Sequence, residues 1–326
     1  MQILKHYFAP DGPGAALAVA ADSETPLIEC VGLANVEDRI AITAETPFEL
    51  ASASKWFTAA AILLLAERES LDLQAPLHAV LPQLEGDASH RPLTIRDLLW
   101  HTSGLVDYLH QGGYTPAEEM TKDYVLAQLP SWVAAAVPGR EHQYSNTNYF
   151  CLARVVEAVA GSEFSEFVAA NLVEPFGMSS TSVGAQGLNQ SRALGYQNLG
   201  YGIPTFQQVP ETPIDTDGDG GLVSSLNDLL KWQAAFWGGQ ILNDESLRRM
   251  QTPGTLDSGE SFPYGMGLQI EKGGSAGCWH GHGGSWTNTT VLMGRYTNLK
   301  TTIILLSNEW MAPVERLYQR AALRDE

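Results

Sequence analysis

Strand-like runs stand at the two ends of this chain of 326 residues, and helical spacing fills its middle. Near the start, apolar runs at 14–21 and 26–33 flank the turn-forming segment 22–25, which predicts an antiparallel hairpin. Four strand-like segments and a last helix follow near the other end, at 264–271, 278–281, 287–297, 301–306 and, for the helix, 314–322. The two ends pair most simply into one sheet. We therefore predict an α/β fold with an antiparallel sheet flanked by helices and an inserted all-α lobe.

The middle of the chain carries the signals of helix starts and ends. A long apolar helix is predicted at 52–68. Thr94 and Asp97 form the capping-box pattern of a helix that Gly104 ends. Further helices are predicted at 123–128, 146–160, 162–173 and 225–236. The segment 180–221 is rich in Gly, Pro, Asn and Asp, which predicts loops.

The length favours two domains. We predict that residues 1–70 and 200–326 form a discontinuous α/β lobe and that residues 71–199 form an all-helical inserted lobe. A cleft between two lobes is a common place for a small-molecule site, so we expect the active site in the cleft.

The charge balance argues against polyanionic partners. The chain has 19 Lys and Arg against 37 Asp and Glu, and its net charge is −18. Such a surface repels phosphates and anionic lipids, so we expect a small-molecule substrate and neither nucleic acid nor membrane as a partner. No apolar run is long enough to span a bilayer and no signal-peptide pattern is visible, so we expect a cytoplasmic location. The three cysteines disfavour a disulfide framework, and the oligomeric state is left open.

The run Ser-Ala-Ser-Lys at 52–55 stands at the start of the long predicted helix. Residues three apart share a helix face, so the hydroxyl of Ser52 and the amine of Lys55 can meet. The positive helix end favours a developing oxyanion, and a neutral lysine beside a serine makes an activated nucleophile. Taken alone this Ser-x-x-Lys pattern is weak evidence, because a serine at a helix start is usually a cap.

Two further motifs carry groups suited to the same chemistry. In Tyr-Ser-Asn at 144–146, the phenol can relay a proton and the amide can hold a substrate carbonyl. In Gly-His-Gly-Gly-Ser at 281–285, glycines let a ligand approach backbone N–H groups. Taken alone, the first motif is typical of a helix cap and the second of a hairpin turn.

In this order the three motifs resemble those of the serine β-lactamase and penicillin-binding-protein-like family. The closest resemblance is to the branch of class C β-lactamases, D-amino-acid peptidases and β-lactamase-like esterases. The stretches 98–105, 220–225 and 306–308 are similar too, and within the first we interpret His101 as a brace for the helix end. The resemblance covers nearly the whole chain and implies a β-lactamase-like fold, with an α/β lobe from both ends and an inserted helical lobe.

The resemblance implies a serine hydrolase that uses no cofactor and no metal. Ser52 matches the acylated nucleophile, Lys55 its proton acceptor, and Tyr144 the group that passes the proton to the leaving group. The N–H groups of Ser52 and Ser285 would form the oxyanion hole. The predicted substrate-binding and oxyanion residues are Asn146, His282, Gly283, Gly284 and Ser285. Water would then attack the acyl group on Ser52.

The third motif departs from the family pattern, because classical members have Lys-Thr-Gly where this chain has His-Gly-Gly at 282–284. The change removes a fixed cation and a hydroxyl, both suited to a substrate carboxylate. We therefore expect an esterase or a hydrolase of small amides or D-amino-acid peptides. The alternatives are a true class C-type β-lactamase and a non-catalytic penicillin-recognising binding or scaffold protein. Trp56 and Trp286 flank the motifs and are candidates for an apolar acyl pocket or for the core.

Two metal-site patterns are weaker. Residues 215–220 fit the first six positions of a calcium loop, but position twelve is Leu226 rather than Glu. Cys278, His280 and His282 alternate along one strand and share a face, but no fourth zinc ligand is marked.

Overall fold

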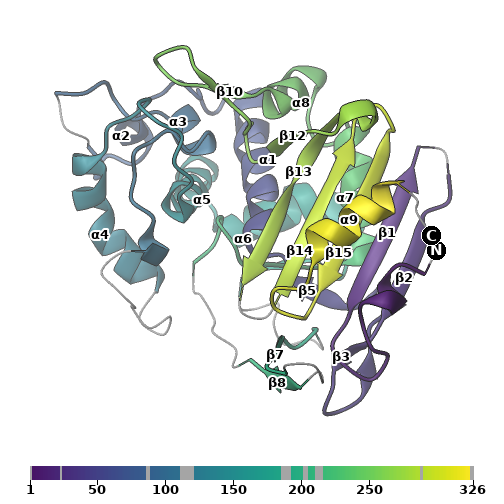
Figure 1. Ribbon diagram of the computed structural model, residues 1–326. Helices are drawn as coiled ribbons and strands as arrows, with labels where there is room; N and C mark the ends of the chain where they lie inside the picture. The colour runs from purple at the N-terminus through teal and green to yellow at the C-terminus, as the bar shows by residue number, and fades with distance from the viewer. Residues whose placement is uncertain are drawn as a thin grey trace.

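The computed structural model describes residues 2–22, 24–85, 89–110, 121–184, 192–200, 205–209, 216–286 and 289–323. A six-stranded antiparallel sheet dominates it, with helices on both faces of the sheet and more helices beside it (Figure 1). This arrangement confirms the predicted α/β class. Parts of the predicted loop at 180–221, Asp215 of the calcium pattern and the start of the strand predicted at 287–297 lie outside the described residues.

Both ends of the chain build the sheet, as predicted. Its strand order is β12-β13-β14-β15-β1-β2. These strands are β1 (Ala15–Ala21), β2 (Leu27–Val31), β12 (Gln269–Lys272), β13 (Cys278–Trp286), β14 (Thr289–Tyr296) and β15 (Thr301–Ser307). Ala15 lies opposite Ser307 on one side and Val31 on the other, so the first strand pairs with the last one as well as with its hairpin partner.

Alternate residues of β1 enter two different cores. Ala16 and Ala18 face the large core that contains the long helix α1 (Ser54–Glu67), whereas Leu17 and Val19 face a smaller core beneath the C-terminal helix α9 (Val314–Leu323). The neighbouring strand β15 is buried along its whole length and divides its side chains in the same way. A strand covered on both faces needs apolar side chains on both, which explains the continuous apolar run in β15.

The helix α1 links the sheet to the helical region. It is buried on nearly all sides and packs against β13 and against α5 (Asn146–Ala160). A helix in such a position must be apolar all round, as this sequence is. The other helices of this region are α2 (Leu77–Val80), α3 (Ile95–Leu99), α4 (Lys122–Ala135) and α6 (Phe164–Val168), the last continuing as a π-helical segment, Ala169–Val173.

Two predicted helix caps are confirmed. Thr94 and Asp97 form a reciprocal capping box at the start of α3, and Ser225 Oγ accepts a hydrogen bond from the N–H of Asp228 at the start of α7 (Leu226–Trp237). The helix α3 ends at Leu99, earlier than the predicted stop. The backbone turns into the left-handed region at His101, which has a φ of 55°.

Several elements differ from the prediction. The helix α8 (Asp244–Gln251), capped by Asn243, was not predicted. The strand predicted at 264–271 shortens to β12, because Gly267 has a φ of 74° that bends the chain out of an extended path. In the other direction, β13 continues past Gly281 to Trp286 because β14 pairs with it along that length.

The remaining strands are short: β3 (Leu33–Asn35), β4 (Ile40–Ala41), β5 (Pro47–Glu49), β6 (Ser182–Val183), β7 (Tyr196–Asn198), β8 (Phe206–Gln208), β9 (Leu222–Ser225), β10 (Gly254–Thr255) and β11 (Ser261–Phe262). Two of them, β6 and β7, fall inside the range 71–199 that was predicted to be all-helical. The strand β6 has its partner in β9, far away in the sequence, so a local pattern could not mark it. The division into two lobes stays a prediction.

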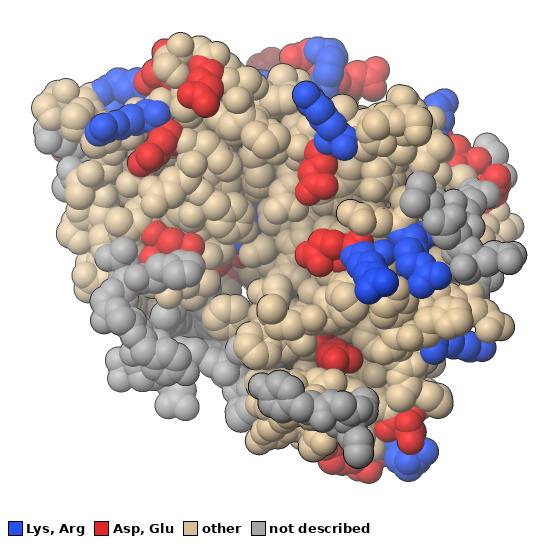
Figure 2. Space-filling model, viewed as in Figure 1, with Lys and Arg blue, Asp and Glu red and all other residues tan. Residues whose placement is uncertain are grey.

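Among the described residues, no helix is both long and apolar enough to cross a membrane. On the face shown in Figure 2, acidic and basic side chains are scattered over the surface and often lie beside one another. The charges on this face are therefore mixed rather than sorted by sign.

Candidate active site

Ser52 lies in a single 3₁₀ turn, Ala51–Ala53, that leads directly into α1. Ala51 has a φ of 45°, in the left-handed region that residues other than glycine rarely adopt, so the backbone turns sharply just before Ser52. Gly284 of β13 packs against this turn: a Cβ atom there would lie 2.2 Å from the carbonyl oxygen of Leu50. A glycine at this position is therefore what lets the strand approach the turn that carries Ser52.

The Lys55 side chain is fully buried, and its Nζ atom reaches three oxygens. It lies 2.7 Å from Asn146 Oδ1, 2.7 Å from the backbone oxygen of Asp219 and 3.1 Å from Ser52 Oγ. The first two oxygens can only accept a hydrogen bond, whereas the serine hydroxyl can accept or donate one. Lys55 can thus keep this position as an ammonium that donates three hydrogen bonds, or as an amine that accepts the proton of Ser52.

Asn146 is the first residue of α5, and its side-chain amide is held at both ends. Oδ1 accepts a hydrogen bond from Lys55, and Nδ2 donates one to Asp107 Oδ2 at 2.9 Å. The contact with Asp107 fixes which end of the amide faces Lys55. The structure brings Asn146 to the Ser-x-x-Lys motif, while its hold on a substrate carbonyl stays a prediction.

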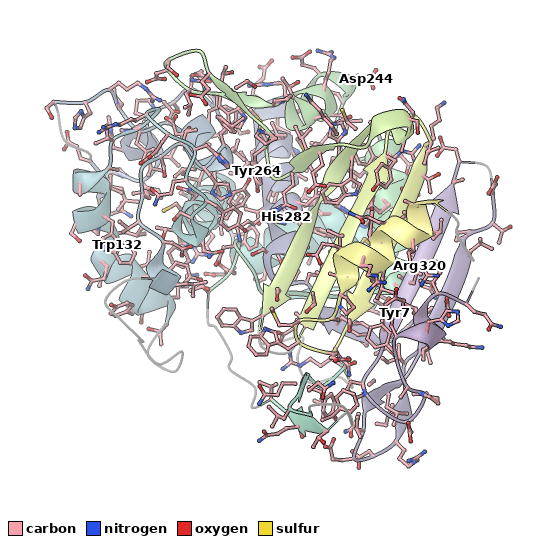
Figure 3. The ribbon with its side chains drawn as sticks, in the orientation of Figure 1. Tyr7, Trp132, Asp244, Tyr264, His282 and Arg320 are labelled. Carbon is pink, nitrogen blue, oxygen red and sulfur yellow. The ribbon has the colours of Figure 1, made fainter. Side chains whose placement is uncertain are left out.

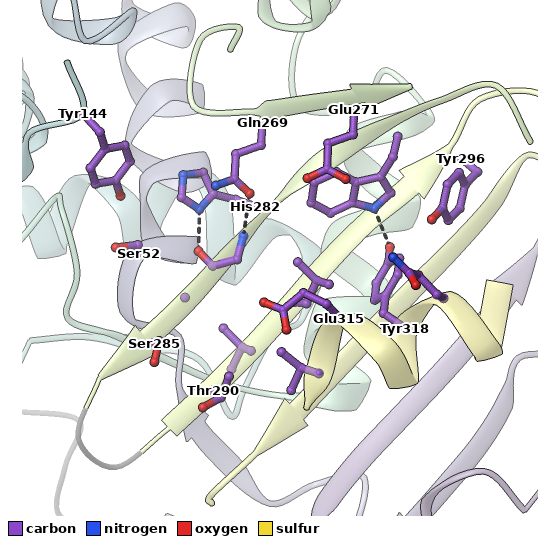
Figure 4. A pocket seen from close by; sticks show the side chains of 17 residues that line it. Ser52, Tyr144, Gln269, Glu271, His282, Ser285, Thr290, Tyr296, Glu315 and Tyr318 are labelled. Carbon is purple, nitrogen blue, oxygen red and sulfur yellow. Dashed lines mark hydrogen bonds between the residues drawn. The ribbon is translucent and has the colours of Figure 1, made fainter. Parts of the chain in front are cut away.

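Tyr144 projects from the loop before α5 into the mouth of the site and is 36% exposed. The centroid of its ring lies 5.0 Å from Lys55 Nζ. In Figure 4 its hydroxyl points toward Ser52. The three residues predicted to act as nucleophile, base and proton relay therefore lie together around one point.

His101 supports the loop that carries Tyr144. The two rings are tilted by 32° with 4.3 Å between centroids. His101 Nδ1 accepts hydrogen bonds from the N–H of Ser145 at 3.2 Å and from the amide of Asn148 at 2.9 Å. Burial, together with the positive charge of Lys55, lowers the pKa of His101 well below its usual value, so the ring is neutral. These contacts give His101 a structural role, but they hold the loop before α5 and the start of α5 rather than the end of its own helix, for which the brace was predicted.

His282 of β13 is buried and lies close to Tyr264 (Figure 3). Its Nδ1 lies 2.5 Å from the backbone oxygen of Gly283 and must donate to it, so Nε2 accepts a hydrogen bond from the Tyr264 hydroxyl at 3.1 Å. Burial, and then the charge of Lys55, lower the pKa of His282 to about 3. The ring is neutral at ordinary pH and gives a substrate carboxylate no fixed cation.

The end of β13 beyond Gly281 offers a candidate oxyanion donor. The strand β12 pairs with β13 only as far as Gln269 opposite Gly281. Past that point the N–H of Gly283 donates to the side chain of Gln269 at 3.3 Å. Because N–H groups alternate between the two edges of a strand, the N–H of Ser285 points off the same edge. Gly283 is thus already engaged, and Ser285 is the donor position next to the groove that Ser52 lines.

A groove of about 520 Å³ runs from Ser52 and Tyr144 across the sheet to α9 (Figure 4). Its far part is walled by the aromatic side chains Trp279, Tyr296 and Tyr318. Glu271 and Glu315 add two carboxylates, and none of the described residues that line the groove is a lysine or an arginine. The groove is therefore suited to an extended substrate that carries no negative charge.

The two tryptophans beside the motifs do not form a shared acyl pocket. Trp56 is fully buried and packs edge-on against Trp232 and Phe236, so it belongs to the core. Trp286, at the end of β13, is not among the described residues that line the groove. The acyl-pocket hypothesis is therefore wrong for Trp56, because the apolar face of α7 covers its ring.

The residues of the two metal patterns have other surroundings. In the described part of the chain, no group of three or more His, Cys, Asp or Glu side chains could hold a metal ion. Within the zinc pattern, Cys278 is exposed whereas His282 is buried. Within the calcium pattern, Asp217 forms an ion pair with Arg154.

Four side chains of the site were not identified as functional from the sequence: Tyr108, Asp219, Tyr264 and Gln269. Asp219 is buried beside Lys55 and accepts a hydrogen bond from the Tyr108 hydroxyl at 2.6 Å. Burial raises the pKa of Asp219 to about 6. Of the four, only Asp219 stood in a sequence pattern that was considered, and that pattern was considered only as a weak match to a calcium loop.

Comparisons with known proteins agree with this geometry. A family model described as Beta-lactamase matches residues 2–326. The chain is 29% identical over 296 residues to penicillin-binding protein 4* of Bacillus subtilis. The aligned region covers 85% of this chain and 64% of the relative. It is 32% identical over 288 residues to a D-aminopeptidase of Brucella anthropi, which covers 84% of this chain and 52% of the relative. The chain thus spans between about half and two thirds of the length of these relatives.

A solved structure extends the similarity to the fold. The penicillin binding protein from Bacillus halodurans matches with a TM-score of 0.79 and 25% sequence identity, over 94% of this chain and 96% of that one. The fold predicted from the order of the motifs is therefore confirmed.

Proposed function

The chain belongs to the β-lactamase family, and from this premise we propose that it is a serine hydrolase that forms an acyl-enzyme on Ser52. The observation that carries the proposal is the 3.1 Å contact between Ser52 Oγ and Lys55 Nζ. A lysine bonded to two obligatory acceptors and one hydroxyl is fitted to take the proton of that hydroxyl without moving.

In the acylation step, Ser52 Oγ attacks the substrate carbonyl carbon while its proton passes to Lys55. The N–H groups of Ser52 and Ser285 receive the negative charge that develops on the carbonyl oxygen. Tyr144 then relays a proton to the nitrogen or oxygen of the leaving group as its bond to carbon breaks. Water attacks the resulting ester, releases the acid and restores the Ser52 hydroxyl.

We propose small amides and peptides of D-amino acids, together with uncharged esters, as the substrates. The names of the D-aminopeptidase relatives support the amide class. The neutral ring of His282 and the carboxylates of Glu271 and Glu315 support substrates that carry an amine rather than a carboxylate. The similarity to a penicillin-binding protein makes β-lactam hydrolysis the second candidate.

Labelling with a fluorophosphonate tests the acyl-enzyme. We expect a single adduct by intact mass, located on Ser52 by peptide mapping, and no adduct in Ser52→Ala. The control is Ser131→Ala, which changes an exposed serine of α4 and should label like the wild type. A wild type without an adduct, or a Ser52→Ala protein that still gains one, would refute the proposal.

A substrate panel separates the candidate classes. It contains short-chain p-nitrophenyl esters, amides of D-amino acids with their L-enantiomers as controls, and a chromogenic cephalosporin. We expect the highest kcat/KM among the D-amino-acid amides and the esters. A cephalosporin hydrolysed faster than either class would favour the β-lactamase instead.

A further inference from the structure

Asp219 is the buried acid next to Lys55. It lies in the turn before β9, is 5% exposed, and its backbone oxygen accepts a hydrogen bond from Lys55 Nζ at 2.7 Å. The contact joins residues 164 positions apart in the sequence. Both groups are removed from water, so the charge of the Asp219 carboxylate acts on the Lys55 ammonium.

The two oxygens of the Asp219 carboxyl group differ in their hydrogen bonds. Its Oδ2 accepts a hydrogen bond from the Tyr108 hydroxyl at 2.6 Å, and Tyr108 also lies 2.7 Å from Thr216 Oγ1. Its Oδ1 is buried and has no hydrogen-bond partner among the described residues. A buried carboxylate oxygen without a donor is costly, so a nearby positive charge is what makes the ionised form tolerable.

The charges around Lys55 single out Asp219. Lys55 faces two neutral histidines, His101 and His282, and the rings of Tyr144 and Tyr149. Asp107 is linked to Lys55 through the amide of Asn146, whereas the backbone oxygen of Asp219 bonds to Lys55 directly. The ionisable groups that face Asp219 are Lys55, Tyr108, Asp217 and the buried thiol of Cys151.

The neighbouring acid has a different partner. Asp217 is two residues away and forms an ion pair with Arg154. Its charge is thus compensated at another place, and it serves as a matched control for the charge on Asp219. Two effects on the pKa of Asp219 oppose each other: burial raises it to about 6, while the charge of Lys55 acts to lower it. The second effect agrees with the short distance between Asp219 and Lys55.

We propose that Asp219 is a positioning residue of the Ser52–Lys55 pair, whose buried carboxylate stabilises the ammonium form of Lys55 and thereby sets the pH at which Lys55 accepts the Ser52 proton. The inference rests on the proposed function, because it requires Lys55 to act as the base. The hydrogen bond from Lys55 goes to the backbone oxygen of Asp219, which a change of side chain does not remove, so such a change tests the charge of the carboxylate.

The variant Asp219→Asn removes the charge and keeps an oxygen for Tyr108. Acylation rises with pH as Lys55 loses its proton, and a less stabilised ammonium loses that proton at lower pH. The test measures how kcat/KM, or the rate of fluorophosphonate labelling, depends on pH. In Asp219→Asn we expect the rising limb of this pH profile to move to lower pH by about one unit. Asp217→Asn should leave the limb where it is in the wild type.

Thermal unfolding gives a second readout that does not depend on turnover. The pKa of Asp219 is raised in the folded protein to about 6, above the ordinary value of about 3.9. The folded state therefore loses stability as the pH rises through this interval. Asp219→Asn should raise Tm at pH 8 and leave it nearly unchanged near pH 4, whereas a purely packing role would lower Tm at both.

The outcomes separate the two proposals. A folded Asp219→Asn protein that labels on Ser52 with an unchanged limb overturns the role of Asp219 and leaves the proposed function standing. A limb that moves equally in Asp217→Asn also overturns it, because the effect would then be one of general surface charge. A wild type that never labels on Ser52 overturns the proposed function and this inference with it.

Discussion

The Tyr264 hydroxyl lies 3.1 Å from Nε2 of His282, and both side chains are buried. Tyr264 is the donor in this pair, because the other ring nitrogen of His282 donates to the backbone oxygen of Gly283. The two contacts hold the imidazole in one orientation and one tautomer. The third motif of this chain therefore shapes the wall of the groove instead of giving it a positive charge.

The variant Tyr264→Phe should destabilise the protein. It leaves Nε2 of His282 buried without a donor, which costs about 1–3 kcal/mol of unfolding free energy. Urea unfolding at pH 7.5 measures the loss. Tyr296→Phe, a change of a half-buried tyrosine on β14, is the control and should stay within about 0.5 kcal/mol of the wild type. Equal stability of the two variants would contradict the importance of the Tyr264 contact.

The low pKa of His282 predicts a loss of stability in acid. In the unfolded chain a histidine takes up a proton near pH 6.5, whereas burial keeps His282 neutral in the folded protein down to about pH 3. Stability from this group is therefore complete above about pH 6.5 and falls as the pH falls, by about 2 kcal/mol at pH 5. His101, whose pKa burial also lowers, acts in the same direction.

Chemical unfolding at pH 7.5 and pH 5 measures this effect. The variant His282→Asn has no group that titrates at this position, so its stability should change less between the two pH values than that of the wild type. The comparison removes the contributions of all other groups, which are common to both proteins. The same pH dependence in both proteins would show that His282 is not the cause.

The fold could be predicted where its signals are local. The hairpin of β1 and β2 is marked by two apolar runs and a turn, and the start of α7 by Ser225 and Asp228. The joining of both ends into one sheet followed from the need of each strand for a partner. The glycine-rich end of β13 was harder to predict as a strand. Its sequence is typical of a turn, but it stays extended because a neighbouring strand pairs with it.

The same limit applies to the site. Ser52 and Lys55 could be paired because they stand three residues apart in the sequence, on one face of the predicted helix. The contacts of Lys55 with Asp219 and of Tyr264 with His282 depend on which distant segments meet in the folded chain. No periodicity or spacing in a single sequence encodes such a meeting, so Asp219 and Tyr264 had no role before the structure.

The proton relay predicts losses that do not add. Lys55→Ala and Tyr144→Phe should each lower kcat by at least about 100-fold, on the scale of general acid–base catalysis. The double variant should lose far less than the product of the two losses, because both residues move the same proton. Tyr124→Phe, an equally exposed tyrosine on α4, should retain wild-type kcat. Losses that multiply would assign the two residues to independent steps.

The carboxylates of the groove predict a preference for cationic substrates. Glu271 and Glu315 line the groove that begins at Ser52, and no described lysine or arginine lines it with them. Glu271→Gln and Glu315→Gln together should raise KM for a D-amino-acid amide with a free amine by about three- to tenfold, as expected for two exposed charges. KM for an uncharged p-nitrophenyl ester should not change, and Glu260→Gln, on an exposed loop, should change neither. Added salt should shrink the difference, since it screens exposed charges. An equal rise in KM for the ester would mean that the glutamates shape the groove and that their charge plays no part in binding.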